Sequence, residues 1–446
     1  MSFFSRFRGG VHPHGHKNTA ASATQPLPRP VHLVLPMRQH IGAPCKPLVK
    51  VGDQVALGQP IGDTDAAVAA PIHATASGKV IAVEPRLTPG GRMEMSVVLE
   101  TAPEDTWWDG LPEGLTWQLD PQALSPETLR DRIRQAGIVG LGGAGFPTAT
   151  KITPRSGAPV PDVVLLNGAE CEPVLTSDHR LMLEEPAKVV LGLRLFMQAT
   201  GARKGIIALE DNKMDAAEAL RACLRGEADI AVEVLPARYP QGAEKMLVWA
   251  CTGRAVPLGG FPLDVGVVVQ NVATAAAVAT ALAEGKPLTE RIVTVAGRVG
   301  QPGNWRAPIG TPFVDLVKAC GDVDGPLAKV VAGGPMMGMP VPSLTVPVTK
   351  TTGGMILMSP ADVAMPESGP CIRCGRCVAA CPMGLLPAQL ALIAETAHWE
   401  DAKRFHISAC IECGSCSYSC PARRPIVQAV RLTKAELNRK AAAARG

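Results

Sequence analysis

The sequence is poor in aromatic residues and in net charge. Phe, Trp and Tyr make up 4% of the 446 residues, and the formal net charge at pH 7 is only +4. Proteins that hold single-stranded nucleic acids stack bases on aromatic side chains beside a strongly basic groove. This composition therefore excludes a nucleic-acid-binding protein. The length is enough for about three domains of ordinary size.

Long apolar runs are also missing. The most apolar one, residues 265–285, is interrupted by Gln270 and Asn271, and its Ala-rich half predicts a helix of a globular domain, not a membrane span. The start, MSFFSRFRGG, is too short and too basic for a signal peptide. It fits either a disordered end or a contact with a membrane surface through Phe3, Phe4, Phe7, Arg6 and Arg8.

Cysteine, in contrast, is concentrated in two runs of one pattern. "CIRCGRCVAACP" (371–382) and "CIECGSCSYSCP" (410–421) both read C-x2-C-x2-C-x3-C-P. This is the bacterial ferredoxin pattern, in which the fourth Cys of each run serves the cluster of the other run. The expected ligands of the first [4Fe-4S] cluster are Cys371, Cys374, Cys377 and Cys420, and those of the second are Cys410, Cys413, Cys416 and Cys381.

Disulfides and zinc are the alternatives for so many thiols. Disulfides need an oxidising compartment, which no segment of the sequence indicates. Zinc prefers paired C-x2-C knuckles that supply four ligands in total, and a triple run ending in x3-C-P does not suit a tetrahedral ion. Because the full pattern occurs twice, we expect two iron–sulfur clusters.

The N-terminal part predicts a small β-module. Residues 49–83 alternate short β-branched runs with Gly-Asp and Ser-Gly turns. The pattern resembles biotinyl and lipoyl carrier domains, which are barrel-sandwich hybrids. Those carriers attach their cofactor to a Lys at the tip of a hairpin, and the corresponding segment 61–71 contains no Lys. We therefore expect the fold without the swinging arm.

The pattern then changes to α/β. Apolar runs at 162–168 and 204–210 alternate with helical stretches at 125–137 and 215–228, which predicts a parallel sheet with a nucleotide site at the strand ends. A smaller β-rich unit follows at 291–321. Between the two Cys runs, residues 385–405 are helical in pattern, which indicates an α-helical ferredoxin domain.

A glycine-rich loop and an acidic turn mark the α/β part. "GIVGLGGAGFPTATK" (137–151) brings closely spaced backbone N–H groups and Lys151 to a place where a phosphate would bind. A glycine turn without a ligand is nearly as common. In "VVLLNGAECEP" a strand ends in Asn167, Glu170 and Glu172, which suit the hydroxyl groups of a ribose or ribityl chain, or else a solvated turn.

These motifs resemble two related groups of proteins. "GLGGAGFPTATK" and "NGAECEP" are similar to the flavin loop and to the N-A-D-E-S-E-P motif of the NADH-binding subunit of respiratory complex I. From "GGVHPHGHK" onward, the order of modules resembles the RnfC family, a component of the Rnf (Rsx) electron-transport complexes, over nearly all of residues 9–430. Ala169 and Ala243 stand where the complex I pattern has acidic residues.

The resemblance implies a fold and its division. It implies a multidomain α/β protein of four folded parts and a basic tail. The expected limits are 1–112 for the tail and barrel-sandwich hybrid, 113–288 for the FMN- and NADH-binding core, 289–345 for a β-grasp-like SLBB unit, 346–430 for the two-cluster ferredoxin domain, and 431–446 for the basic tail.

The resemblance also implies the cofactor residues. For FMN they are Gly140, Gly142, Gly143, Gly145, Lys151, Asn167 and Asn271. NADH is expected to stack near Phe146 and to be held by Glu172, with Glu170 and Glu244 in supporting positions. No residue is named as a catalytic acid or base, because the flavin and the clusters carry the chemistry.

The expected function is electron transfer in a membrane-bound, ion-translocating complex. NADH is a two-electron donor and a [4Fe-4S] cluster carries one electron, so a flavin is needed as the converter. The flow would run between NADH, FMN, the two clusters and partner subunits or a ferredoxin, in either direction. Two alternatives stay open: an electron-relay and docking subunit with a vestigial nucleotide core, and the flavoprotein subunit of a soluble NAD-linked hydrogenase or formate dehydrogenase.

The resemblance implies a place in the cell as well. We expect a peripheral attachment to the cytoplasmic side of the inner membrane, through the other Rnf subunits. The basic end, residues 431–446, is a candidate lipid contact or else a solvated helix.

Overall fold

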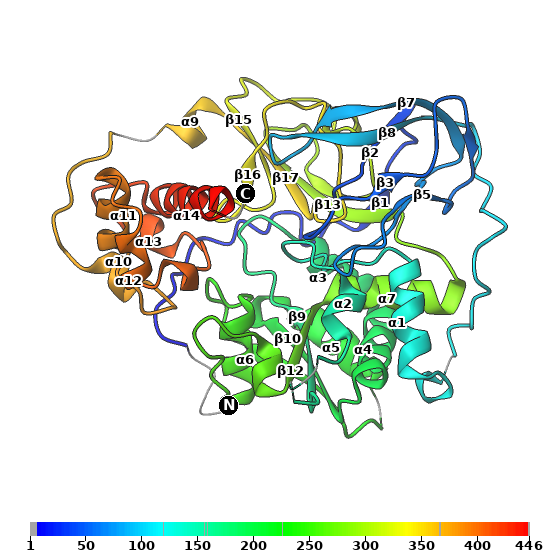
Figure 1. The fold of residues 1–446 in the computed structure, drawn as a ribbon, viewed down its shortest axis with the longest axis horizontal. Helices are drawn as coiled ribbons and strands as arrows, with labels where there is room; N and C mark the ends of the chain where they lie inside the picture. The colour runs from blue at the N-terminus through cyan, green and yellow to red at the C-terminus, as the bar shows by residue number, and fades with distance from the viewer. Residues whose placement is uncertain are drawn as a thin grey trace.

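The computed structural model describes residues 7–118, 120–155, 157, 159–224, 226–364 and 367–444. These residues build a β-module, an α/β core, a second β-rich unit and a helical C-terminal domain, in that chain order (Figure 1). The C-terminal domain lies at one end of the molecule and the β-module toward the other. Four residues of the expected membrane contacts, Phe3, Phe4, Arg6 and Arg445, lie outside the described residues.

The N-terminal β-module consists of two small sheets. Leu33 and Leu35 are fully buried in its core, while His32 and Val34 of the same strand are more exposed, as a half-buried strand requires. One sheet has the order β2 (His32–Pro36), β8 (Met93–Thr101), β7 (Gly78–Leu87) and β4 (Gln54–Val55). The other has the order β3 (Lys46–Pro47), β5 (Pro60–Asp63) and β6 (Ile72–His73).

The α/β core is built on a four-stranded sheet. Its order is β11 (Ile230–Leu235), β10 (Lys204–Glu210), β9 (Val163–Gly168) and β12 (Val267–Asn271), and every pairing is parallel. The central strand β9 is a continuous apolar run that is almost wholly buried, as expected when both faces of a parallel sheet are covered. The predicted parallel sheet is therefore present.

Helices cover both faces of this sheet. Helices α4 and α7 pack closely together on one face, where their side chains join the largest apolar cluster. Helix α6 covers the other face with Leu247 and Val248. The helices of the core are α1 (Pro126–Gln135), α2 (Thr148–Ile152), α3 (Ser177–Glu184), α4 (Pro186–Thr200), α5 (Met214–Cys223), α6 (Glu244–Thr252) and α7 (Val272–Glu284), with 3-10 turns at Pro121–Ala123, Asp211–Lys213 and Pro262–Val265.

The second β-rich unit centres on a six-stranded mixed sheet. Helix α8 (Phe313–Ala319) packs on it through Phe313 and Leu316, in a separate apolar cluster. The order is β1 (Thr24–Pro26), β14 (Gly303–Pro308), β13 (Glu290–Gly297), β17 (Gly354–Met358), β15 (Lys329–Ala332) and β16 (Met339–Pro340).

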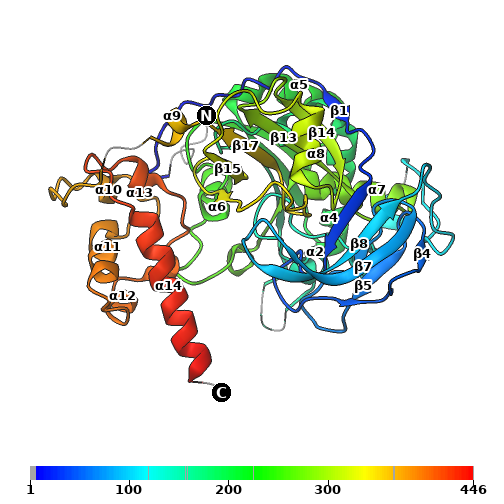
Figure 2. The ribbon, with the colours of Figure 1, turned by 90° about the horizontal axis from the view of Figure 1, so that it is seen from above.

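The C-terminal domain is helical, as its sequence predicts. Each Cys run contains a one-turn helix, α10 (Arg376–Ala379) or α13 (Ser415–Tyr418). The longest helix, α14 (Ile426–Ala443), packs on α11 and extends away from the domain (Figure 2). The remaining helices are α9 (Pro360–Val363), α11 (Pro387–Glu395) and α12 (Asp401–Arg404), with a 3-10 turn at Ile407–Ala409.

An N-terminal arm, residues 7–23, ties these parts together. The Gly10 N–H donates to the Ala380 carbonyl in the C-terminal domain at 2.9 Å, and Val11 and Tyr239 exchange backbone hydrogen bonds at the core. The arm then crosses the molecule and enters the six-stranded sheet as β1, beside β14 (Figure 1). One continuous segment thus contacts the ferredoxin-like domain, the core and the second β-rich unit.

Among the described residues, no helix combines the length and the apolar character that crossing a membrane requires.

Candidate iron–sulfur and flavin sites

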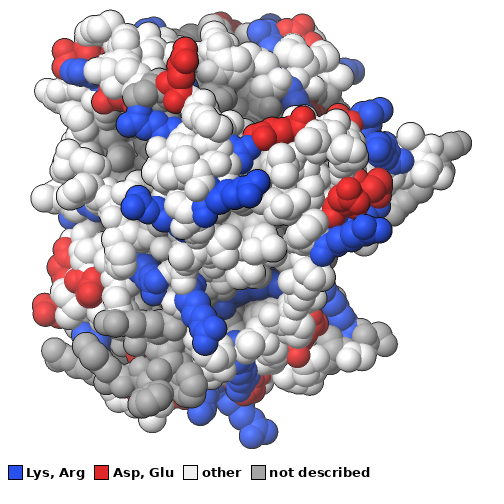
Figure 3. All heavy atoms as spheres, turned by 90° about the vertical axis from the view of Figure 1, so that its left-hand side faces the viewer, with Lys and Arg blue, Asp and Glu red and all other residues white. Residues whose placement is uncertain are grey.

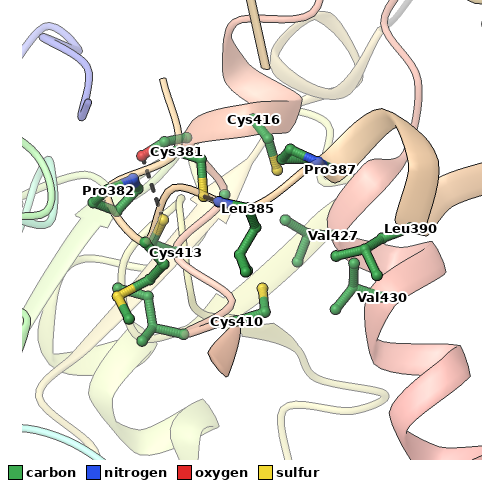
Figure 4. Close-up of a pocket in the computed structure, with 14 residues that line it drawn as sticks. Cys381, Pro382, Leu385, Pro387, Leu390, Cys410, Cys413, Cys416, Val427 and Val430 are labelled. Carbon is green, nitrogen blue, oxygen red and sulfur yellow. Dashed lines mark hydrogen bonds between the residues drawn. The ribbon is translucent and has the colours of Figure 1, made fainter. Parts of the chain in front are cut away.

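Four of the eight clustered cysteines surround one small pocket. Cys381, Cys410, Cys413 and Cys416 line it together with apolar side chains such as Leu385 (Figure 4). Burial, together with the three neighbouring sulfurs, raises the pKa of the Cys416 thiol to about 12. Four thiols gathered at one pocket are a suitable ligand set for a metal cluster, since coordination removes their protons.

The other four cysteines lie in the same domain but closer to water. Cys371 and Cys374 are exposed and Cys377 is buried. Burial raises the pKa of Cys377, and the nearby Cys420 sulfur adds to this effect. Arg424 interacts with the Cys371 sulfur. Cys420 thus approaches the first run and Cys381 the second, a grouping that agrees with the crossed ligand assignment.

A cluster and a single ion place different demands on the spacing of these side chains. Within the part of the chain that the structure describes, no three His, Cys, Asp or Glu side chains converge so as to hold one metal ion. Zinc needs four ligands about 2.0–2.3 Å from one centre. In a [4Fe-4S] cluster each thiolate binds a different iron, so the sulfurs stand farther apart. Two separate groups of four thiols fit two clusters.

The second Cys run contacts the α/β core directly. A Cβ atom on Gly414 would lie 3.1 Å from the Met336 carbonyl oxygen. The N–H of Met336 in turn donates to Glu172 of the acidic turn at 3.0 Å. Cys413 packs with Tyr239, whose hydroxyl donates to the same Glu172 carboxylate at 3.3 Å. A single layer of residues therefore separates the pocket of the second run from the acidic turn.

The predicted glycine loop leads from α1 to α2. The Gly140 N–H donates to the Phe146 carbonyl at 2.9 Å and closes the loop. Gly145 has φ +71°, and a Cβ there would approach Thr351 to 2.8 Å, so only glycine fits. Between these positions, residues 142–144 are exposed to solvent.

The loop lies over the carboxyl ends of two core strands. Asn167 of β9 and Asn271 of β12 are paired in register, and Asn271 also caps α7 by accepting from the Ala273 N–H at 2.8 Å. A Cβ on Gly142 would lie 2.5 Å from the Asn271 Nδ2 atom. The structure therefore brings the glycine loop and both asparagines together at one edge of the sheet, where open α/β sheets bind ligands.

Glu170 has a structural role in this arrangement. Its carboxylate accepts hydrogen bonds from the N–H groups of Asp178, at 2.7 Å, and His179, at 3.2 Å, at the start of α3. A carboxylate at a helix N-terminus satisfies free N–H groups and complements the helix dipole. Its side chain is 4% exposed, so Glu170 caps α3 from inside the protein.

The other two acidic residues also have protein partners. Glu172 accepts from the N–H groups of Met336 and Met337, at 3.0 and 2.8 Å, and burial raises its pKa. Glu244, at the start of α6, forms an ion pair with Lys151 at 2.5 Å. This pair is partly exposed, so Lys151 and Glu244 remain accessible to a ligand in a way that Glu170 is not.

The sequence did not point to Lys17, which fixes the acidic turn. Its ammonium donates to three backbone carbonyls, those of Glu170, Glu172 and Leu175, at 2.8, 2.9 and 2.5 Å, and burial lowers its pKa. The partners are more than 150 positions away, so only the fold reveals them. The only sequence feature that could have drawn attention to Lys17 is the conspicuous "GGVHPHGHK" segment that contains it.

Lys350 anchors the glycine loop in a similar way. Its ammonium is buried and donates to the carbonyls of Pro71 in the β-module and of Gly137 at the start of the loop, at 2.7 and 2.6 Å. Its backbone N–H donates to Gln39 at 3.0 Å. Burial lowers the pKa of Lys350 to about 7. No motif in the sequence marked this residue, because its partners lie in two other parts of the fold.

Replacing Lys350 by Met is expected to lower the free energy of unfolding by about 2 to 4 kcal/mol, since two buried carbonyls lose their donor. The loss should grow as the pH rises from about 7 toward the ordinary lysine value of 10.5, because the unfolded wild-type chain then binds more protons than the folded one. Anaerobic thermal unfolding on both sides of pH 7 measures it. Lys318→Met, at a side chain 65% exposed, is the control. A loss that shrinks with rising pH would contradict the assignment.

Two features of the glycine-loop region fit a flavin phosphate. A Cβ on Gly143 would meet nothing within 4 Å, so the space in front of its backbone is free of protein. The amide nitrogen of Gln241 is buried and lacks a hydrogen-bond partner among the described residues. Its neighbour Gly242 accepts from Asn167 at 2.7 Å, which places this donor beside the predicted site. Both features suit a ligand rich in hydrogen-bond acceptors.

Models of known protein families match the chain in four places. The RnfC barrel sandwich hybrid domain matches residues 5–104, the Nuo51 FMN-binding domain 133–280, the SLBB domain 292–340, and the 4Fe-4S dicluster domain 370–424. These domains occur in the order expected from the sequence. The predicted fold class is therefore confirmed.

Curated relatives match over nearly the whole chain. A subunit of the proton-translocating ferredoxin:NAD(+) oxidoreductase complex of Clostridium ljungdahlii is 44% identical, over 96% of this chain and 93% of the relative. The corresponding subunit of the Na(+)-translocating complex of Acetobacterium woodii is 43% identical, over 97% of both. A subunit of the ion-translocating oxidoreductase complex of Rhodobacter capsulatus is 40% identical, over 97% of this chain and 83% of the relative.

Solved structures of an NAD+-reducing [NiFe]-hydrogenase share the fold more distantly. The H2-reduced form aligns with a TM-score of 0.50 at 23% identity, over 70% of this chain and 64% of the hydrogenase chain. That similarity concerns the fold alone. The identity and coverage of the curated relatives are decisive: the chain belongs to the RnfC family of the ion-translocating ferredoxin:NAD(+) oxidoreductase, or Rnf, complexes.

Proposed function

We propose that this subunit transfers electrons between NADH, an FMN and two [4Fe-4S] clusters, and between the clusters and partner subunits of an ion-translocating membrane complex, in either direction. The observation that carries the proposal is the contact at Met336, which touches both the second Cys run and Glu172 of the acidic turn. The proposed two-electron donor site and the proposed one-electron carrier site would thus adjoin within one chain.

The proposed cluster ligands keep the crossed assignment. Cys381, Cys410, Cys413 and Cys416 would hold the inner cluster beside the core, since they line one pocket. Cys371, Cys374, Cys377 and Cys420 would hold the outer cluster, whose first two ligands are exposed. Electrons from the core would reach the inner cluster first and leave through the outer one.

The proposed flavin site comprises the glycine loop and the two strand-end asparagines, with Gly140, Gly142, Gly143, Gly145, Lys151, Asn167 and Asn271 as its residues. When bound, FMN supplies the conversion between two-electron and one-electron transfer. The exposed N–H groups of the loop and the Lys151 ammonium would hold the phosphate. For NADH we propose a place beside Phe146, with Glu172 and Glu244 near it. Glu170 would act indirectly, by holding the start of α3.

The hydrogen bonds that Glu170 and Glu172 accept within the protein favour one alternative function, an electron-relay subunit. Carboxylates that already bind backbone N–H groups contribute less to a nucleotide, so a relay subunit with a vestigial nucleotide core is the second candidate. Anaerobic cofactor analysis separates the two functions. The proposal requires one FMN released on denaturation, with about eight iron and eight sulfide per chain. Iron and sulfide without flavin would favour the relay.

We propose a peripheral attachment at the cytoplasmic side of the inner membrane, where NADH is available. Partner subunits would provide most of the attachment. In the basic end, Arg431 and Lys434 are both paired with Glu412, at 3.1 and 2.8 Å, which leaves few cations of α14 for lipid.

High salt or alkaline carbonate is therefore expected to release the chain from membranes that contain all its partners, without detergent. Immunoblots of the supernatant and pellet measure the release. Release by detergent alone would contradict a peripheral attachment, as would a chain already free in low-salt lysate.

A further inference from the structure

The two Cys runs are internal repeats, so their surfaces can be compared position by position. Both have the same positive φ at the second residue after the first Cys, 56° at Arg373 and 56° at Glu412. Each also carries a glycine of positive φ before its short helix. The backbones are therefore equivalent, and differences between the repeats reflect what each surface contacts.

The second repeat shows how such a surface docks. Its Ile411, directly after the first Cys, packs in an apolar cluster with Met336 and Tyr239. Glu412 forms ion pairs within the domain, and Ser415 is fully buried. This face of the repeat is closed by the rest of the protein.

The equivalent face of the first repeat is open. Ile372, the counterpart of Ile411, is 64% exposed. Arg373 and Arg376 stand in place of Glu412 and Ser415, and both are exposed. In the two ribbon views α10 lies farther from the core than α13, which agrees with this difference (Figures 1 and 2).

The rim of the first repeat is basic. Arg423, after the distant ligand Cys420, adds a third exposed guanidinium where the other repeat has Gly384. Within the described part of the chain, none of these three arginines has an acidic partner within 4.0 Å. The neighbouring acid Glu395 is already paired with Arg424. On this side of the molecule, Lys and Arg run through the middle and Asp and Glu lie mostly toward the edges (Figure 3).

We propose that Ile372, Arg373, Arg376 and Arg423 form the docking face for an acidic iron–sulfur carrier protein or domain, at the outer cluster. An exposed apolar residue within a charged rim, beside a redox centre, is the arrangement of a transient electron-transfer contact. The cations attract an acidic carrier and orient it with its own cluster toward Cys371 and Cys374. One electron then leaves the carrier's cluster and reduces the outer cluster, or passes in the opposite direction.

The proposal rests on the proposed function only in requiring the outer cluster, and its test needs neither NADH nor flavin. The probe is a small acidic ferredoxin, reduced with dithionite and freed of the excess. Stopped-flow absorbance follows its oxidation by the purified, cluster-loaded full chain. The variant carries Arg373→Glu, Arg376→Glu and Arg423→Glu together.

The control carries an equal charge change on elements without cluster ligands: Lys403→Glu, Arg404→Glu and Lys440→Glu, on α12 and α14. We expect the rim variant to slow the second-order rate by about tenfold or more at low salt, and the control variant to leave it nearly unchanged. Added salt should slow the wild type and should not slow the rim variant. A cationic cytochrome c is repelled by the basic rim. It should therefore accept electrons faster from the reduced rim variant than from the reduced wild type at low salt.

Iron content and dithionite-reduced spectra establish that each variant keeps both clusters. If the triple variant loses a cluster, the rate is measured instead on variants with a single substitution, Arg373→Glu or Arg423→Glu. Equal rates for the rim and control variants at low salt would overturn the proposal. So would a rim variant that loses only its binding to vesicles containing phosphatidylserine while the electron-transfer rate stays unchanged, since that result assigns the face to a lipid surface.

Discussion

Replacing Cys420 by Ser is expected to remove the cluster of the first run and to leave the cluster of the second run in place. The fourth Cys of this pattern reaches across to the other repeat, and Cys420 lies close enough to Cys377 to affect its pKa. We expect a loss of up to about four iron and four sulfide per chain, or conversion to a smaller cluster. Low-temperature EPR of the reduced protein, with iron analysis, measures the effect.

The reciprocal variant Cys381→Ser should damage the inner cluster, because Cys381 lines the pocket formed by the second run. Cys223→Ser, outside both runs, is the control for loss of a thiol. A Cys420→Ser protein that retains the outer cluster and loses the inner one would mean that each repeat binds its cluster with its own four cysteines.

Replacing Gly143 by Val is expected to reduce the FMN content by an order of magnitude or more while both clusters persist. Gly143 is exposed and its backbone has a negative or extended φ that other residues adopt, and a Cβ there meets no protein atom within 4 Å. The side chain would therefore enter the space proposed for the phosphate without straining the fold. Flavin fluorescence after denaturation, divided by protein concentration, measures the content.

Gly142→Val is a less specific variant. Its side chain would displace the Asn271 amide, with which a Cβ would collide at 2.5 Å, so loss of flavin there has two causes. Gly157→Val is not a suitable control for Gly143→Val, because φ is +76° at Gly157 and a side chain would strain the backbone there. Gly90→Val, in open space in the β-module, is the suitable control. Unchanged flavin content in the Gly143 variant would show that the loop is structural only.

Local sequence patterns predicted the features that depend on residues close together in the sequence. The Cys spacing, the glycine loop before α2 and the apolar run of β9 each depend on neighbours in sequence. The approach of the loop to Asn167 followed from the rule that parallel strands end at one edge of the sheet. Asn271 was expected there only from the family resemblance.

The roles of Lys17, Lys350 and Glu170 could not be predicted in this way. Lys17 and Lys350 each bind carbonyls in other parts of the fold, and a buried lysine leaves no periodic pattern. Glu170 follows a strand as a ribose ligand would, yet its positive φ of 44° turns the carboxylate back onto α3. The exposed arginines of the first repeat could be interpreted as a docking face only by comparison with the second repeat, whose equivalent face packs against the core.

The central claim is that NADH and the clusters exchange electrons within this single chain. Anaerobic titration of the purified, cofactor-loaded protein with NADH tests it most directly, with the visible absorbance of the clusters and EPR as readouts. We expect NADH to bleach at least the inner cluster, and the Gly143→Val protein to lose this response while dithionite still reduces both clusters. Clusters that dithionite reduces and NADH does not, in a wild-type chain containing FMN, would contradict the account.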